Sequence, residues 1–330
     1  MSGLRRSRRR RGAALALLGG LVCGLGAGCG AGDAVLGVRD VPSATVSGAP
    51  LPEPAAADVV TRVLDEAAAG RTEALSGTAL DLARAAERAR TAPPPPQPSL
   101  SRPREPDVLA VSRGPAWPRT ILAATTDPVG EVPTLHWLVS TGAAEPFTLA
   151  ASVPLLPGAS VPALGPVAGG APALAPTERA GLAMAPRSAL EAYAAALQRP
   201  RPRTTPGVAT DDAFATALAT AFTAQQKSLG ALSTAKAEHA VGQDRTLALG
   251  LADGGALVVG RLDRTDTFTA RPGARQLRVP ESYVRLAGRA TATRSITLTT
   301  LQPVVLVVPL GDGTVTAVAA GEQPAAAVAR

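Results

Sequence analysis

At 330 residues, the chain is long enough for one large domain or two of ordinary size. Its hydrophobic content of 46% argues for a folded protein, although aromatic residues make up only 2% of it. Six arginines among the first eleven residues account for most of the formal net charge of +7, and without them 27 basic residues face 26 acidic ones. That balance excludes the basic surface of a typical nucleic-acid-binding protein, so we expect no nucleic-acid partner.

Residues 1–28 have the features of a lipoprotein signal peptide. A cationic segment, 1–11, precedes an uncharged run over 13–27 that is too short and too rich in glycine for a membrane-spanning helix. The run ends in Gly26-Ala27-Gly28-Cys29, and small residues before a cysteine are what a lipoprotein signal peptidase accepts. Because positive charge stays cytoplasmic, the chain that follows is exported. We therefore expect Cys29 to carry a diacylglycerol anchor that holds the protein on the outer face of the cell membrane.

Two alternatives to this leader assignment stay open. Gly26 occupies the position where lipoprotein signals usually have leucine, so the leader also fits an ordinary secretory signal in which Cys29 is incidental. The paired arginines leave the export route open between general secretion and the twin-arginine pathway. Cys23, the only other cysteine, lies inside the leader. A mature chain that begins at a lipid-modified Cys29 therefore has no free thiol, which excludes thiol catalysis, a disulfide bond and a metal site with cysteine ligands.

The first half of the mature chain reads as helices followed by strands. Residues 29–57 are rich in Gly, Ala, Ser and Pro and predict a flexible tether. Apolar residues at helical spacing predict helices over 58–69 and 72–90, and four prolines at 93–96 end the helical stretch. Alternating patterns then predict strands over 107–112, 119–126, 134–140 and 147–154. The first α+β unit is therefore expected over 51–166.

The second half repeats this order of elements after a linker over 167–186. One helix is expected after Pro186 and a second after Thr210, which is expected to be its N-cap. Strands are expected over 234–241, 245–251, 256–262, 294–301, 304–309 and 314–319, with a short one near 277–279. The second unit covers 187–320, and 321–330 is expected to be a tail.

These elements predict an α+β fold made of two tandem units, each with helices packed on an antiparallel sheet. Turns such as Asp253-Gly254-Gly255 leave no room for a crossover helix, so parallel strands are not expected. The order of helix and curved sheet is also similar to the cystatin-like cone of NTF2-type domains, an analogy at the level of fold alone.

No arrangement of residues in the sequence indicates catalysis, a metal or a cofactor. The chain lacks the Gly-x-Ser-x-Gly turn of serine hydrolases, a P-loop and a dinucleotide-binding motif. His136 and His239 are its only histidines, and each falls in an expected strand. Asp253, Asp263 and Asp266 are better explained by a solvated hairpin than by paired acid–base carboxylates. We therefore expect a protein that is not an enzyme, with no catalytic, metal or cofactor site.

Several short motifs resemble a known family. They are Gly114-Pro115-Ala116-Trp117-Pro118-Arg119, Ala123-Ala124-Thr125-Thr126, Leu155-Leu156-Pro157-Gly158, Pro186-Arg187-Ser188-Ala189-Leu190-Glu191-Ala192-Tyr193 and Asp253-Gly254-Gly255-Ala256-Leu257-Val258. In this order they are similar to a family of actinobacterial secreted lipoproteins whose large C-terminal domain has no assigned function. The likeness covers roughly 105–310. It implies an envelope lipoprotein and carries over no catalytic residues.

The sequence leaves three functional hypotheses open. The first is a non-enzymatic envelope lipoprotein that binds an envelope protein, a glycan or a lipid. The second is a module that holds a small apolar ligand in a curved sheet, which requires a pocket lined by Trp117, Trp137, Phe147 or Tyr193; these aromatic residues otherwise serve as core. The third is an envelope hydrolase, which requires a histidine beside a carboxylate in a cleft.

Substitution of Cys29 by serine tests the anchor. Cys29→Ser removes the thiol that receives the diacylglycerol, so we expect the protein to move from the membrane fraction to the medium. Intact-mass measurement of the wild-type N-terminus should show the acyl mass in the same preparation. A wild-type protein without acyl mass would contradict the prediction.

Overall fold

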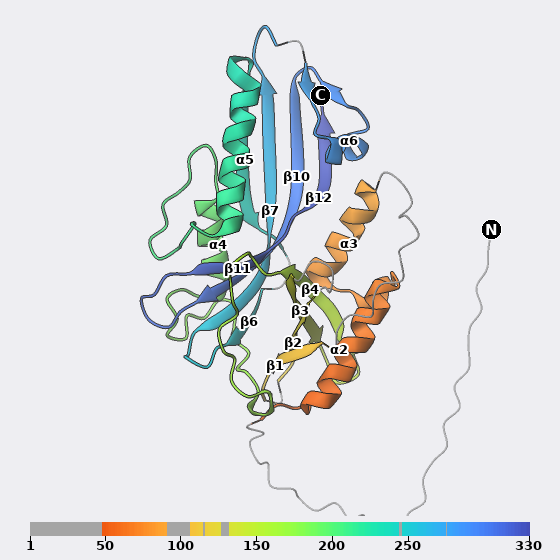
Figure 1. The fold of residues 1–330 in the computed structure, drawn as a ribbon, viewed down its shortest axis with the longest axis vertical. Coiled ribbons are helices and arrows are strands. Elements are labelled where there is room, and N and C mark those ends of the chain that lie inside the picture. The colour runs from red at the N-terminus through yellow and green to blue at the C-terminus, as the bar shows by residue number, and fades with distance from the viewer. Residues whose placement is uncertain (1–47, 91–105, 115, 127–131, 244–245, 275) are drawn as a thin grey trace, which may run out of the picture. The chain divides into compact units, whose positions relative to one another are not determined.

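The computed structural model describes residues 48–90, 106–114, 116–126, 132–243, 246–274 and 276–330 (Figure 1). The expected signal peptide, Cys29, most of the expected tether and the four prolines at 93–96 lie outside these residues. Within the described ranges, no helix is both long enough and apolar enough to cross a membrane.

Two helices open the described part of the chain. They are α2 (Glu53–Ala68) and α3 (Gly77–Ala89), with the short 3-10 helix η1 (Thr72–Ala74) between them. Both expected helices are confirmed, but their starts differ. The first begins earlier because proline is tolerated in the first helical turn, where Pro54 lies. The second begins later because Ser76 is extended and its N–H donates to the Leu149 carbonyl over 2.9 Å.

The first sheet is an antiparallel meander in the order β1-β2-β3-β4. Its strands are β1 (Asp107–Val111), β2 (Arg119–Thr126), β3 (Pro133–Ser140) and β4 (Thr148–Pro154), each within one residue of its expected bounds. Side chains alternate between two buried faces. One face packs against Val60 and Val63 of α2 through residues such as Ile121 and Leu138. The opposite face, which carries Trp137, meets the second sheet.

The helices of the second half are α4 (Pro186–Ala196) and α5 (Ala213–Leu229). The start after Pro186 is confirmed, whereas the N-cap expected at Thr210 is wrong. Asp212 caps α5, because its Oδ1 accepts the Ala215 N–H over 2.9 Å. Its Oδ2 accepts the Tyr193 hydroxyl over 3.0 Å, so one carboxylate joins α4 to the start of α5.

The second sheet has six antiparallel strands. They are β5 (Ser233–Val241), β6 (Leu247–Gly250), β7 (Ala256–Ala270), β10 (Ser295–Val308), β11 (Thr316–Ala320) and β12 (Gln323–Ala329). The long strands β7 and β10 pair along their whole length. Each then serves two partners in turn: β7 pairs with β6 and β5, and β10 pairs with β11 and β12. Figure 1 shows α5 alongside the long strands.

Two expectations about β10 and the C-terminus are wrong. The ranges 294–301 and 304–309 form one strand, because Pro303 lies where β12 gives way to β11 as the neighbour, so no strand needs its missing N–H. The range 321–330 is not a tail, since Gln323–Ala329 pairs with β10 as β12. Its alanine-rich sequence has no clear alternation of apolar and polar residues, and the strand exists because β10 offers an edge.

The stretch over 263–293 contains more structure than expected. It holds the end of β7, the paired short strands β8 (Leu277–Arg278) and β9 (Thr291–Ala292), and helix α6 (Glu281–Ala287). The short strand expected near 277–279 is confirmed, and α6 was not expected. Pro280 precedes this helix and Gly288, in the left-handed region, ends it.

The two halves share one apolar core. Trp137 and Leu135 of the first sheet belong to the same buried cluster as Leu257, Val259 and Val305 of the second. The segment expected to be a linker is bound into this junction, since it bridges to both sheets at Ser112–Ala171 and Ala173–Leu249. Residues 45–330 accordingly form one compact unit. The α+β class with antiparallel sheets is therefore confirmed.

Replacing Trp137 by alanine should destabilise both halves together. We expect Trp137→Ala to lower the free energy of unfolding by about 3–5 kcal/mol, because it leaves a cavity in the shared core. Urea unfolding followed by circular dichroism should show one transition at a lower midpoint. Trp117→Ala is the matched control, since Trp117 is 37% exposed and its loss should cost little. Two separate transitions in the Trp137 variant would contradict a shared core.

Candidate functional site

The four aromatic residues expected around a pocket do not come together. Trp137 and Tyr193 are fully buried in two different apolar clusters, and Phe147 packs, partly buried, on the cluster beneath α2. Burial and the neighbouring Asp212 charge raise the pKa of Tyr193, which keeps its hydroxyl a donor. Trp117 is the most exposed of the four, and it lines a hollow on the surface.

The two histidines are buried, and none of their contacts with the described residues is to a carboxylate. His136 meets the Thr125 hydroxyl at 2.8 Å and the Ser152 hydroxyl at 3.1 Å. Burial lowers the pKa of His136 to about 4. Burial and the charges of Arg264 and Arg199 lower the pKa of His239 to about 3, and its ring nitrogens have no hydrogen-bond partner among the described residues. Neither histidine has the carboxylate contact that the hydrolase hypothesis requires.

The expectation that three aspartates share one solvated hairpin is wrong, because only Asp253 lies in the turn, whereas Asp263 and the buried Asp266 lie within β7. Asp253 accepts the Gly255 N–H over 2.9 Å and so shapes the turn. Asp263 pairs with Arg261 at 2.8 Å, and Asp266 pairs with Arg264 at 2.9 Å. Among the described residues, no group of three or more His, Cys, Asp or Glu side chains is placed to hold a metal ion.

A polar groove lies over β7 and β10, between α5 and α6, with a volume of about 350 Å³. At its base Arg264 lies between Asp266 and Glu322, which it meets at 2.9 and 3.3 Å. Burial raises the pKa of Asp266, while the nearby Arg264 charge opposes that rise. Sequence reasoning missed this cluster because Glu322 falls in the expected tail. The charges satisfy one another, so the groove is best explained as a structural ion-pair network.

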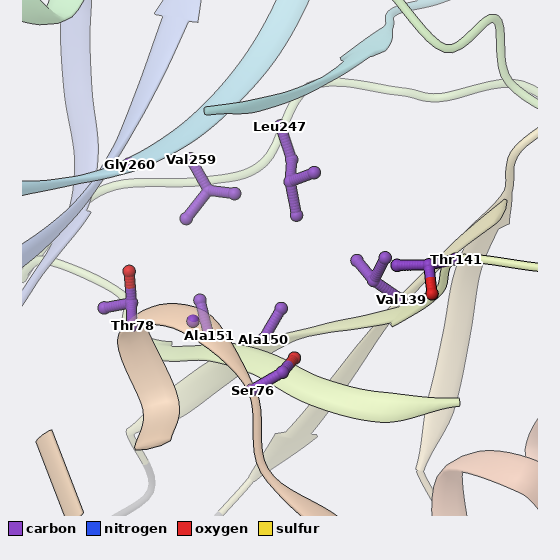
Figure 2. A pocket seen from close by; sticks show the side chains of 10 residues that line it. Ser76, Thr78, Val139, Thr141, Ala150, Ala151, Leu247, Val259 and Gly260 are labelled. Atoms are coloured by element: carbon purple, nitrogen blue, oxygen red, sulfur yellow. The ribbon is translucent and has the colours of Figure 1, made fainter. Parts of the chain in front are cut away.

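The hollow with the clearest apolar character lies at the junction of the two sheets, and we call it the seam cavity (Figure 2). Its volume is about 210 Å³. The residues that line it are Ser76, Gly77, Thr78, Val139, Thr141, Ala150, Ala151, Leu247, Val259 and Gly260. Ser76, Gly77 and Thr78 lie at the start of α3. The other residues come from β3 and the residue after it, Thr141, from β4, and from β6 and β7 of the second sheet.

The seam cavity exists because small residues face larger ones across the junction. Figure 2 shows Leu247 and Val259 directed from the second sheet toward Ala150 and Ala151 of β4. Alanine at the two β4 positions leaves unfilled the space that a larger side chain would take. Hydroxyl groups of Ser76, Thr78 and Thr141 lie around the apolar walls. The Ser76 hydroxyl is held by that of Thr148, which donates to it over 2.8 Å.

This lining suits noncovalent binding. None of the residues that line the cavity carries a titratable side chain. Ligand sites in proteins combine mostly apolar walls with a few polar groups that orient the ligand, and the seam cavity has this composition on a small scale. No pattern in the sequence indicates this cavity, since alanine at 150 and 151 looks the same in a filled core as beside a cavity.

The comparisons with known proteins identify a family whose function is not assigned. Residues 55–327 match the model of a family described as a domain of unknown function, DUF8094. No curated protein and no solved structure matches the chain significantly. The match includes the range 105–310 and agrees with the expectation of a large domain of unassigned function.

The buried histidines should make the protein less stable in acid. In the unfolded chain His136 takes up a proton near pH 6.5, whereas in the fold it does so only near pH 4. The unfolded state therefore binds more protons between these values, and stability falls as the pH is lowered from about 6.5 to 4. For His136 this loss amounts to about 3 kcal/mol at pH 4.

Chemical denaturation at pH 7 and pH 4 measures this loss. His136→Gln should lose less stability than the wild type over the same range, because glutamine does not titrate. Lys236→Gln, on an exposed position of β5, should lose as much as the wild type. Equal losses in the wild type and His136→Gln would refute the assignment.

Proposed function

The chain belongs to the DUF8094 family of domains of unknown function, and we propose that it is a non-enzymatic binding protein of the cell envelope. In this proposal Cys29 anchors it to the outer face of the cell membrane, and the domain beyond the tether binds a small apolar ligand. The single observation that carries the binding role is the seam cavity.

The features of residues 1–29 support the location. They combine a cationic segment, an uncharged run and small residues before a cysteine. The family match begins at residue 55, after this leader and most of the expected tether. A leader and a tether that precede the domain fit a protein held at a membrane by its N-terminus. The residues quoted above also resemble those of actinobacterial secreted lipoproteins, which agrees with this location.

The chemistry of the seam cavity supports the ligand class. Val139, Leu247 and Val259 provide apolar walls, and no charged group lines the space. A charged ligand would lose its hydration there without gaining a partner, whereas an apolar one would lose unfavourable contact with water. Of the binding roles expected from the sequence, the cavity therefore favours the small apolar ligand. An alkyl chain of modest length is a ligand of this class.

Filling the cavity tests the proposal. Isothermal titration of the protein with 1-hexanol and 1-octanol should show saturable binding, and binding should raise the melting temperature. Ala151→Leu places a larger apolar side chain in the cavity, so we expect binding at least tenfold weaker. Because the cavity offers room, this variant should stay folded with a small loss of stability.

Ala326→Leu is the matched control, because it makes the same chemical change at an exposed position of β12. It should bind both alcohols as the wild type does. Glycerol, which is polar, should not bind measurably. Equal affinity in Ala151→Leu and the wild type, or no saturable binding at all, would contradict the proposed role of the cavity.

A further inference from the structure

A second hollow lies at the connection between β1 and β2, and we call it the Trp117 hollow. Its volume is about 330 Å³, and it is bounded by this connection, by residues 173–176 and by the start of β6. The residues that matter for the argument are Arg113, Trp117 and Thr246. Leu247 lines this hollow and the seam cavity, so the two spaces are neighbours with different linings.

Trp117 presents an aromatic surface to solvent. The chain has two tryptophans; Trp137 is fully buried and Trp117 is 37% exposed. The Arg119 guanidinium lies 4.4 Å from the Trp117 ring centroid, in cation–π contact. This contact fixes the plane of the ring while a large part of the side chain remains accessible. In a chain with only 2% aromatic residues, such a held and exposed ring suits ligand contact.

The backbone around the hollow is braced. The Ser112 N–H donates to the Thr120 carbonyl over 2.8 Å, and the Ser112 hydroxyl accepts the Thr120 N–H over 2.9 Å. The Arg113 N–H donates to the Ala171 carbonyl over 2.8 Å. Gly170 has φ +63°, and a Cβ there would lie 2.7 Å from the Arg113 Cβ, so this close approach requires glycine. Arg113 therefore projects from a fixed position.

Thr246 supplies the observation that points to a ligand. Its side chain is 4% exposed, and its hydroxyl has no hydrogen-bond partner among the described residues. Buried polar groups in folded proteins are nearly always paired, and an unpaired one costs free energy. Thr246 is one of the residues that line the hollow, and a ligand hydroxyl or carboxylate there can pair with its hydroxyl once a change of side-chain rotamer turns this buried group toward the ligand.

We propose that the Trp117 hollow binds an anionic saccharide. The C–H face of a sugar ring packs on Trp117, because the face of an aromatic ring is electron-rich. A carboxylate or phosphate on the sugar pairs with Arg113, the one charged side chain among the described residues that line the hollow. A sugar hydroxyl pairs with Thr246. This site is separate from the seam cavity in its ligand class and does not depend on the function proposed above.

Tryptophan fluorescence tests the site directly. Acrylamide should quench Trp117 far more than the buried Trp137, and Trp117→Phe identifies the signal of each. The probes are tetragalacturonate, its uncharged counterpart galactotetraose, and mannose 6-phosphate. We expect one or both anionic sugars to protect Trp117 from quenching in a saturable way, and galactotetraose to bind at least tenfold more weakly. Comparison of the two anionic probes separates carboxylate from phosphate recognition.

Three variants separate the contributions of the site. Arg113→Gln should weaken binding of the anionic sugars at least tenfold, whereas Arg289→Gln, on an exposed arginine elsewhere, should leave it unchanged. Thr246→Val should weaken binding several-fold while raising the melting temperature of the free protein, because it removes an unpaired hydroxyl. Ala151→Leu, which fills the seam cavity, should bind the sugars as the wild type does.

Three results would overturn the proposal. They are the absence of saturable protection by either anionic sugar, equal affinity for galactotetraose, and an unchanged affinity in Arg113→Gln. Saturable protection by decaproline in place of the sugars would also overturn it, since it would identify the hollow as a peptide site.

Discussion

The contact between the two sheets is the interaction on which the rest of the fold depends. The first sheet buries one face under α2, and its other face requires an apolar partner that its own half of the chain does not contain. The second sheet provides that partner through Leu257, Val259 and Val305, while its opposite face packs on α4. Each sheet is thus covered on both sides at the junction. The order of helices and strands repeats along the chain, but the repeat does not produce independent domains, because the central layer is common to both halves.

A charged contact reinforces this apolar junction at its edge. Arg261 of β7 is only 8% exposed and meets Asp81 of α3 at 2.6 Å and Asp263 of its own strand at 2.8 Å. Arg261 and Asp81 belong to different halves of the chain, so this ion pair can form only when the halves are joined. Removing one partner from such a contact costs more than the pair contributes, since the other charge remains partly buried. The pair therefore specifies how α3 meets the second sheet, in addition to the attraction that the apolar core provides.

Alternation of apolar and polar residues was sufficient to predict the first sheet nearly residue by residue, because every one of its strands has turn residues at both ends. The same reasoning failed where tertiary contacts decide. β12 is alanine-rich and becomes a strand through pairing with β10, and Pro303 suggested a strand end although no partner strand needs its missing N–H.

The candidate sites were less predictable still. The seam cavity depends on the small size of the side chains of Ala150 and Ala151. The Trp117 hollow brings Thr246 beside a loop that lies more than a hundred residues earlier in the chain. Such a separation has no local signature in the sequence.

Composition connects these hollows to the fold. Aromatic residues make up 2% of the chain, and its cores are built mainly from alanine, leucine and valine. Small side chains allow sheets to approach closely, but they cannot fill every gap where two twisted surfaces diverge. Leu247 of β6 lies at this junction and contributes to both hollows. A bias toward small residues over the whole sequence thus leaves space at the junction, where both halves of the chain supply walls to the two hollows. Binding of a ligand at that place would add contacts between the halves, and so would stabilise the same junction that holds the fold together.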